Sequence, residues 1–262
     1  MTIGRHVRLW TLVAGSLAIV TAAAAILLPV ALLTLFRRRR LYAAFTTRVA
    51  RLILRIWRVR LHVHGTFETA RQVVYVSNHS STIDLFVLVA LGLPNTRFFL
   101  SGFLQKLIPL GILARLMGTF FTVPQDRTAE RRRIFQHACA VLRRTGESVY
   151  ASPEGGRIVT GDIGPFNKGA FHLATALGAP IVPLYFLIPS DMDPGMGFDV
   201  RPGLVQVFVK PAIDTTDWHV NEARARADEV RTRFVEWHRA TEHLRYPDRL
   251  RPSHAHEELL RA

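Results

Sequence analysis

The sequence predicts an α/β fold: a mixed, largely parallel sheet flanked by helices, preceded by an N-terminal membrane helix and an amphipathic helix. Three observations support this class. Residues 9–36 are apolar and uncharged, regularly spaced arginines follow, and short strand-like runs alternate with helical runs after about Gly65. We therefore divide the chain into a membrane anchor (1–40), an amphipathic interfacial helix (41–64), an α/β domain (65–215), and a C-terminal helix with a basic tail (216–262).

The apolar N-terminal segment is long enough to cross a membrane, because about 20 helical residues span a hydrocarbon core of about 30 Å. A cleaved signal peptide is the alternative, since residues 21–25 are small. Against it, apolar sequence resumes at Ile26 and ends in four arginines at 37–40. Pro29 leaves a re-entrant hairpin open as another arrangement. The arginine block indicates that the α/β domain lies on the cytoplasmic side of the inner membrane.

The next segment, residues 41–63, combines an apolar stripe with a basic one at helical spacing. This pattern is typical of a helix in the headgroup region of an anionic membrane. An ordinary surface helix and a nucleic-acid-binding helix are the alternatives. No nucleic-acid motif occurs elsewhere, so we expect membrane lipids and no nucleic acid as partners. The apolar stripe contains Phe45, Val49, Leu52, Ile53 and Ile56, and the basic stripe contains Arg48, Arg51, Arg55 and Arg58.

The overall charge indicates an anionic partner, because the formal net charge is +14 at pH 7. A phospholipid surface, an acidic carrier and an anionic cofactor all fit this charge. The single cysteine, Cys139, cannot form an internal disulfide, so nothing argues for an oxidising compartment. The 11 histidines show no metal-ligand spacing, and we expect no metal site.

The α/β domain is predicted from alternating runs of residues. Short β-branched or aromatic runs predict strands at 73–76, 97–100, 120–122, 148–151, 181–186 and 205–209. Runs of helical period predict helices at 85–91, 103–116, 129–144, 168–177 and 222–243. Gly146 and Gly178 follow two of these helices, where a left-handed cap is favoured. The arginine- and histidine-rich tail after the last helix is expected to be loose.

A histidine and an aspartate five residues apart follow the first strand of this domain. Neutral His79 can accept a proton because the pKa of imidazole is near 6.5, and Asp84 could orient the ring. On one continuous helix, the two side chains would point about 140° apart. They can therefore meet only if His79 lies in the loop before the helix. A histidine that merely hydrogen-bonds a helix start is the alternative, although ligands do bind at the carboxyl ends of parallel strands.

A glycine-rich segment, residues 152–169, follows the strand predicted at 148–151. Its glycines allow backbone N–H groups to approach a ligand, and Arg157 could hold a phosphate with its planar guanidinium group. Taken alone, a mobile surface loop is the simpler interpretation. The segment is not a Walker loop, because the sequence contains no Gly-Lys-Ser or Gly-Lys-Thr.

Together, the two segments resemble the glycerolipid acyltransferase family, whose bacterial members include 1-acylglycerol-3-phosphate acyltransferase. The family's Asn-His-x4-Asp motif matches Asn78, His79 and Asp84. Its Phe-Pro-Glu-Gly-Thr-Arg motif matches Pro153, Glu154, Gly155 and Arg157, with Ser152 and Gly156 in place of Phe and Thr. Its Phe-x-Lys-Gly and Val-Pro stretches match Phe166, Lys168, Gly169, Val182 and Pro183. The resemblance covers about residues 63–209.

The resemblance implies a membrane-bound O-acyltransferase of phospholipid biosynthesis. It would move a fatty acyl group from acyl-CoA or an acyl carrier protein to a lysolipid hydroxyl, with 1-acylglycerol-3-phosphate as the main expected acceptor. No cofactor is expected. His79 is then the general base, and Asp84 orients it. The residues expected to bind the substrate are Glu154, Gly155, Gly156, Arg157, Arg127 and Lys168.

Two departures from the family pattern concern the acceptor. The family carries an arginine soon after its Gly-x-Ile-Phe segment, but here the nearest one, Arg127, is displaced by about a helical turn. A lysine that the family often carries after the preceding strand is also missing, with Gly102 in that region. A lyso-ornithine lipid or another lysophospholipid is therefore the alternative acceptor. A non-catalytic lipid-binding protein of the membrane surface is the alternative of another class.

Overall fold

The computed structural model describes residues 3–158, 160–193 and 200–245, and residues 246–262 of the expected basic tail lie outside the described residues. Seven strands form one sheet: β1 (Val59–His64), β2 (Val74–Ser77), β3 (Thr96–Ser101), β4 (Phe120–Thr122), β5 (Ser148–Tyr150), β6 (Ile181–Leu187) and β7 (Gly203–Val209). Their order is β1-β7-β6-β2-β5-β3-β4. Only the β6–β7 pair among these strands is antiparallel, so the predicted mixed, largely parallel sheet is confirmed.

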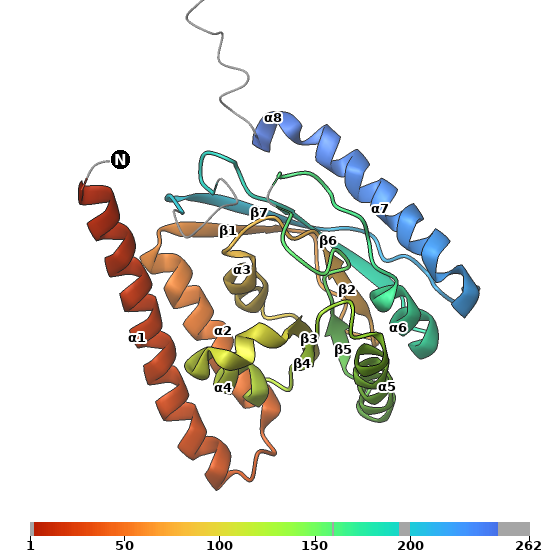
Figure 1. Cartoon of the computed structure of the whole chain (residues 1–262), viewed down its shortest axis with the longest axis horizontal. Coiled ribbons are helices and arrows are strands. Elements are labelled where there is room, and N and C mark those ends of the chain that lie inside the picture. The colour runs from red at the N-terminus through yellow and green to blue at the C-terminus, as the bar shows by residue number, and fades with distance from the viewer. Residues whose placement is uncertain (1–2, 159, 194–199, 246–262) are drawn as a thin grey trace, which may run out of the picture.

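Helices cover both faces of this sheet (Figure 1). They are α1 (Ile3–Leu33), α2 (Arg39–Ile56), α3 (Asp84–Leu91), α4 (Ile108–Leu116), α5 (Thr128–Thr145), α6 (Gly169–Leu177), α7 (Ala223–Ala240) and α8 (Glu242–Arg245), with 3-10 turns η1 (Gly102–Lys106) and η2 (Val220–Glu222). One hydrophobic core joins the sheet to α1, α2, α3 and α4, and a second joins it to α5, α6 and α7. Because both faces are covered, all seven residues of β6 are buried.

The N-terminal segment is one continuous helix with Pro29 inside it, so residues 3–33 do not form the re-entrant hairpin that this proline left open. Within α1, His6–Leu33 is long and apolar enough to cross a membrane. One side of the helix packs on α2 and α4, and Ala23, Ala24 and Ala31 on that side allow close approach. The other side exposes large apolar side chains, which is consistent with membrane association.

The amphipathic segment differs from its prediction at its C-terminal end. The helix expected over 41–64 ends at Ile56, and β1 occupies the last six positions of that range. Arg58 adopts a φ of 56°, which breaks the helical path. Apolar Val59, Leu61 and Val63 then alternate with polar residues, a strand period that the regular arginine spacing obscured. The helical part packs on α3 and α1, as a surface helix of the domain does.

The helix predicted at 103–116 is divided into η1 and α4. Leu107 separates them with a non-helical ψ of 86°, and Pro109 lies in the first turn of α4. A proline is favoured there because its missing N–H would have no helical acceptor. The other predicted elements occur within a few residues of their expected bounds, and Gly146 and Gly178 adopt the predicted left-handed caps.

A group of three charges, the buried Glu147 and two partly buried arginines, connects α2 to the sheet. Glu147, just before β5, forms ion pairs with Arg39 at the start of α2 and with Arg97 on β3. Arg39 also donates hydrogen bonds to the Thr96 and Met117 carbonyls at 3.2 and 3.3 Å. Burial raises the pKa of Glu147, but the hydrogen bond from Arg97 and both positive charges outweigh burial, so the pKa is lower than usual.

Replacing Glu147 by Gln should destabilise the protein strongly, because two neighbouring arginines would lose their counter-charge in a poorly hydrated place. We expect a loss of about 3 kcal/mol in the free energy of unfolding. Thermal melting of the detergent-purified chain should show a fall in Tm of about 6–12 °C. The control is Glu229→Gln on α7, which removes exposed ion pairs and should cost less than about 1 kcal/mol. Equal shifts for the two variants would contradict a structural role for the buried group.

Candidate active site

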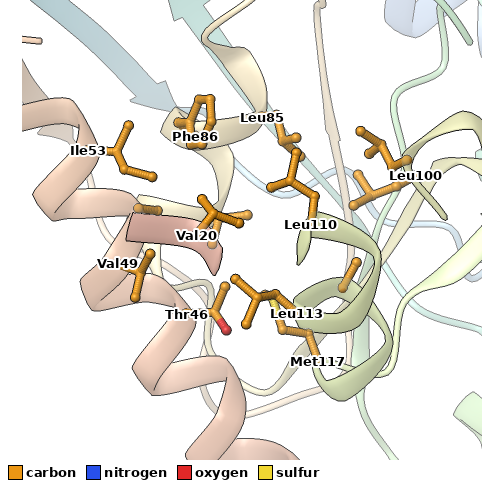
Figure 2. A pocket seen from close by; sticks show the side chains of 14 residues that line it. Val20, Thr46, Val49, Ile53, Leu85, Phe86, Leu100, Leu110, Leu113 and Met117 are labelled. Atoms are coloured by element: carbon orange, nitrogen blue, oxygen red, sulfur yellow. The ribbon is translucent and has the colours of Figure 1, made fainter. Parts of the chain in front are cut away.

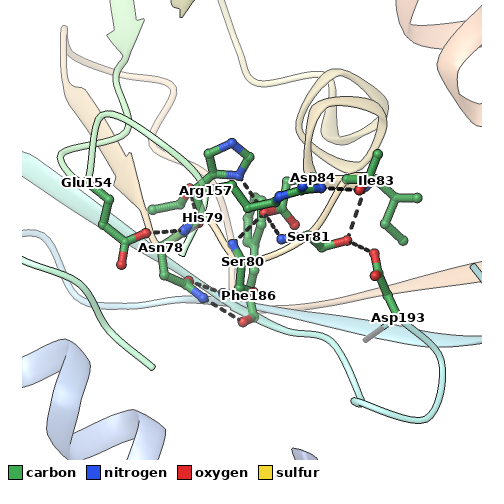
Figure 3. A network of polar contacts seen from close by, with 12 residues as sticks. Asn78, His79, Ser80, Ser81, Ile83, Asp84, Glu154, Arg157, Phe186 and Asp193 are labelled. Atoms are coloured by element: carbon green, nitrogen blue, oxygen red, sulfur yellow. Dashed lines mark hydrogen bonds and ion pairs between the residues drawn. The ribbon is translucent and has the colours of Figure 1, made fainter. Parts of the chain in front are cut away.

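The site begins where β2 ends, and Asn78 fixes the direction in which the chain leaves the sheet. Its amide Nδ2 donates to the Phe186 carbonyl at 3.0 Å, and its Oδ1 accepts from the Phe186 N–H at 2.8 Å. The side chain thus continues the pairing between β2 and β6 by one further step. Residue 79 therefore emerges at the carboxyl edge of the sheet, where α/β folds bind ligands (Figure 3).

His79 and Asp84 form a hydrogen-bonded pair in the loop and at the helix start, as the spacing required. The Nδ1 of His79 and the Oδ2 of Asp84 are 2.7 Å apart. Asp84 is the first residue of α3, and the same Oδ2 accepts the N–H groups of Ser80 and Ser81 at 2.9 Å each. Because the carboxylate accepts from Nδ1–H, the Nε2 of the ring carries the lone pair. The ring is about one-third exposed, so an acceptor can reach it.

The environment of His79 favours its protonated form. Burial lowers the pKa of the imidazole, but the hydrogen bond from the ring to Asp84, together with the negative charges of Asp84 and Glu154, outweighs burial. The pKa of His79 is therefore raised above its ordinary value. A base of raised pKa binds a proton more tightly once it has abstracted one.

Glu154 clamps the loops around this pair. Its carboxylate accepts hydrogen bonds from the His79 N–H and, at 2.8 Å, from the Gly164 N–H. The side chain is 6% exposed, and burial raises its pKa to about 7. Asn167 donates to the carbonyls of Pro153 and Glu154 at 3.0 and 3.2 Å, which joins the glycine-rich loop to the start of α6. Each of the two Glu154 oxygens accepts one backbone N–H group, and the expected role of Glu154 in substrate binding stays a prediction.

The residues after Glu154 lie beside the histidine. Gly155 has a φ of 70°, and a Cβ there would lie 2.8 Å from the amide nitrogen of Asn167, so a side chain is excluded. A Cβ on Gly156 would meet no atom within 4 Å. The Ile158 N–H donates to the His79 carbonyl at 2.8 Å, and Arg157 donates to the Thr82 hydroxyl. The guanidinium group of Arg157 is thereby held at the edge of the site while remaining exposed.

Two expected substrate-binding residues lie apart from the pair. Arg127 precedes α5, its side chain is 58% exposed, and it forms an ion pair with Glu130. Lys168 is exposed just before α6. Within residues 3–158, 160–193 and 200–245, no hydrogen bond or ion pair joins either side chain to His79 or Asp84. The described residues also contain no group of three His, Cys, Asp or Glu that could hold a metal ion.

The structure adds a residue that the sequence did not reveal. The Ser81 hydroxyl donates to the carboxylate of Asp193, which lies after β6 and is buried. Ser81 also accepts the Ile83 N–H at 3.1 Å, so this hydroxyl links the start of α3 to the connection after β6. No local pattern predicts a partner 112 positions away.

An apolar pocket lies between α1, α2, α3 and α4 (Figure 2). The space within it, together with its open side, amounts to about 490 Å³. Leu85 and Phe86, which directly follow Asp84, form part of its wall, and Val20 of α1 and Ala114 of α4 line it from other sides. Thr46 is the one polar side chain among the lining residues. The sequence showed the apolar helices but not the space that they leave between them.

Comparisons with known proteins agree with the motif assignment. The family model Acyltransferase matches residues 58–187. The chain is 33% identical over 166 residues to the chloroplastic 1-acyl-sn-glycerol-3-phosphate acyltransferase BAT2 of Brassica napus, covering 62% of this chain and 45% of that protein. It is 29% identical over 181 residues to 1-acyl-sn-glycerol-3-phosphate acyltransferase alpha of Homo sapiens, covering 67% of this chain and 62% of that protein. The chain thus spans roughly half of the length of these curated relatives.

A solved structure shares the fold. The crystal structure of the 1-acyl-sn-glycerophosphate (LPA) acyltransferase PlsC from Thermotoga maritima superposes with a TM-score of 0.71 at 19% sequence identity. The match covers 89% of this chain and 97% of that one. The family match begins at residue 58 and therefore includes β1, which the expected domain of 65–215 left out. With the motifs, the family match and the fold in agreement, the chain belongs to the acyltransferase family of enzymes.

Proposed function

We propose that this chain is a membrane-bound O-acyltransferase of phospholipid biosynthesis. It moves a fatty acyl group from acyl-CoA or an acyl carrier protein to a lysolipid hydroxyl, with 1-acylglycerol-3-phosphate as the main acceptor. The observation that carries the proposal is the 2.7 Å hydrogen bond between His79 and Asp84 in a loop that Glu154 clamps. The names of the curated relatives support this acceptor.

In this mechanism the Nε2 of His79 is the base, because Nδ1 is bound to Asp84. It removes the proton from the acceptor hydroxyl while the oxygen attacks the thioester carbonyl carbon. The C–S bond then breaks, and the departing thiolate takes the proton from the imidazolium. The Gly156 N–H is our candidate donor to the oxyanion, since the Gly155 N–H already donates to the Ser152 carbonyl at 3.3 Å. No Gly-x-Ser-x-Gly elbow for an acyl-enzyme occurs in the sequence.

Positive side chains around the loop provide the proposed site for the acceptor's phosphate. Arg157 is the first candidate because it is exposed and its loop lies beside His79, and Lys168 adds a second charge. Arg127 is less available because it pairs with Glu130. That pairing is the observation that favours the alternative acceptor, a lyso-ornithine lipid or another lysophospholipid.

The apolar pocket is our proposed site for a fatty acyl chain. Its lining is almost entirely hydrocarbon, and α3 connects its wall directly to Asp84. The outward apolar face of α1 would bring this side of the molecule to the membrane, where lysolipids reside. The arginine block at 37–40 supports an orientation with the α/β domain on the cytoplasmic side of the inner membrane.

Loss of the base should abolish most of the acyl transfer. We expect the detergent-purified chain to acylate 1-acylglycerol-3-phosphate, and His79→Ala to lower the rate by about 10²–10⁴-fold. Product formation is measured by mass spectrometry with both donors and with lyso-ornithine lipid and other lysophospholipids as further acceptors. His172→Ala on α6, outside the site, is the control and should leave the rate unchanged.

The acceptor panel separates the competing functions. If only another lysolipid is acylated, the proposed acceptor is wrong, whereas the proposed mechanism with His79 as the base still holds. If no acceptor is acylated in a His79-dependent manner, the enzyme proposal is wrong and lipid binding without catalysis is favoured.

The rate should rise with pH as His79 loses its proton, because only the neutral ring acts as the base. Since the pKa of His79 is raised, we expect the acidic limb of kcat/KM above pH 6.5. Asp84→Asn should move this limb to lower pH, because the carboxylate that opposes the effect of burial is gone, and should also lower the plateau. Glu154→Gln is the comparison variant, because burial raises the pKa of Glu154 to about 7. If the acidic limb of kcat/KM disappears in Glu154→Gln but remains in Asp84→Asn, the limb reports the titration of Glu154 and not that of His79.

Filling the apolar pocket should shorten the preferred acyl chain. Ala114 is 7% exposed and lines the pocket, so Ala114→Phe places an aromatic ring in the space. We expect kcat/KM for long-chain donors to fall at least tenfold relative to short-chain donors, about 1.4 kcal/mol of lost binding. Ala225→Phe on the exposed side of α7 is the matched control. An equal loss for all chain lengths would show that the pocket does not hold the acyl chain.

A further inference from the structure

Helix α5 has a basic face that is not neutralised by acidic side chains. We define the α5 basic face as Arg132, Arg133, Arg143 and Arg144, which are all exposed. Helix α5 contains one acidic residue, Glu130, and this residue pairs with Arg127 outside the helix. In the part of the chain that the structure describes, no ion pair involves any of the four arginines.

Helix α7 shows that this imbalance is particular to α5. Both helices contain 18 residues, and both are rich in arginine. In α7, however, Arg224 pairs with Asp228, and Arg226 and Arg233 pair with Glu229. The composition of the chain alone therefore does not explain an unpaired row of positive charge on α5.

The shape of the α5 basic face suits a protein partner. The four arginines lie at both ends of one helix face, and Arg144 follows Arg132 by twelve helical steps, or about 18 Å. Between them, Gln136, His137 and Ala140 are also exposed. A face of this length exceeds a single phosphate group, and its charge is complementary to an acidic helix or strand of comparable extent.

The position of α5 argues against the membrane as its partner. α5 packs on the face of the sheet opposite to α1 and its exposed apolar side (Figure 1). The α5 basic face is thus directed away from the surface through which α1 would enter lipid. The segment before α5 approaches the site, because a Cβ on Gly155 would lie 3.2 Å from the amide nitrogen of Gln125. A partner bound to the N-terminal end of α5 would therefore lie close to the glycine-rich loop beside His79.

We propose that the α5 basic face docks an acidic acyl carrier protein that delivers the acyl thioester. This inference rests on the proposed acyltransferase function and specifies how one class of donor is recognised. The arginines attract the carrier and orient it, while the thioester itself is bound in the site near His79. Acyl-CoA, which lacks an acidic protein surface, does not need this face.

The test is a donor-specific loss in Arg132→Glu/Arg133→Glu/Arg144→Glu, which keeps Arg143 because its guanidinium also donates to the Ala176 carbonyl. With palmitoyl-loaded bacterial acyl carrier protein as donor, we expect KM to rise at least about tenfold, since each reversed charge opposes the carrier. With palmitoyl-CoA, KM should change less than about twofold. The matched control, Arg60→Glu/Arg201→Glu/Arg239→Glu, reverses the same number of exposed arginines elsewhere and should change neither KM.

The remaining outcomes separate this inference from the proposed function. Three results would overturn the docking surface and leave the enzyme proposal intact. The α5 variant could change KM equally for both donors, it could change KM for neither, or the control variant could raise KM for the carrier protein equally. If the wild type transfers palmitate from neither donor, the proposed function fails, and direct binding of the carrier is measured instead. The docking surface is supported if the wild type and the control variant bind the carrier protein, the α5 variant does not, and salt weakens the binding. Loss of binding to anionic lipid vesicles in place of the carrier would overturn it.

Discussion

One carboxylate oxygen determines the geometry of the whole site. The Oδ2 of Asp84 accepts from the ring of His79 and from the N–H groups of Ser80 and Ser81, so three groups of the loop converge on one atom. The negative charge lies at the first residue of α3, where the helix dipole stabilises it. Because a charged acceptor makes strong hydrogen bonds, the loop has little freedom to open. The tautomer of His79, and therefore the nitrogen that faces substrate, follows from this contact.

The same helix connects the chemistry to the apolar side of the molecule. Asp84 begins α3, and the next two residues, Leu85 and Phe86, form part of the pocket wall. A shift of α3 along its axis would therefore move the general base and the pocket together. The packing of α3 on α2, and the attachment of α2 to the sheet through Arg39 and Glu147, hold this arrangement from the side opposite to the loop. The ion pairs of Glu147 thus support the position of Asp84 indirectly: they hold α2 on the sheet, and α2 in turn packs on α3.

The sequence predicted those features whose signal is local. Strands such as β6 were found because a strand that is covered on both faces of the sheet is a continuous apolar run. The loop position of His79 followed from the angle between helical residues. β1 was missed because the arginine spacing that continues to Arg58 suggested helix, whereas pairing with β7 decides in favour of a strand. The Ser81–Asp193 contact and the pocket arise only when distant segments pack together. The hydrogen bonds of Glu154 to the His79 and Gly164 N–H groups could not be predicted for the same reason, since both partners lie outside its own motif.

The placement of two carboxylates near one imidazole favours the transition state over the resting state. The neutral ring of His79, which is the form that acts as the base, gains little from the charges of Asp84 and Glu154. When its Nε2 takes the proton of the hydroxyl, the ring becomes cationic, and both negative charges stabilise it at that moment. Burial raises the pKa of Glu154 to about 7, although two backbone N–H groups oppose that rise, so near neutral pH Glu154 carries only part of a full negative charge. A neutral side chain in place of Glu154 would accept the same two N–H groups more weakly, and it would not add charge where the reaction develops it.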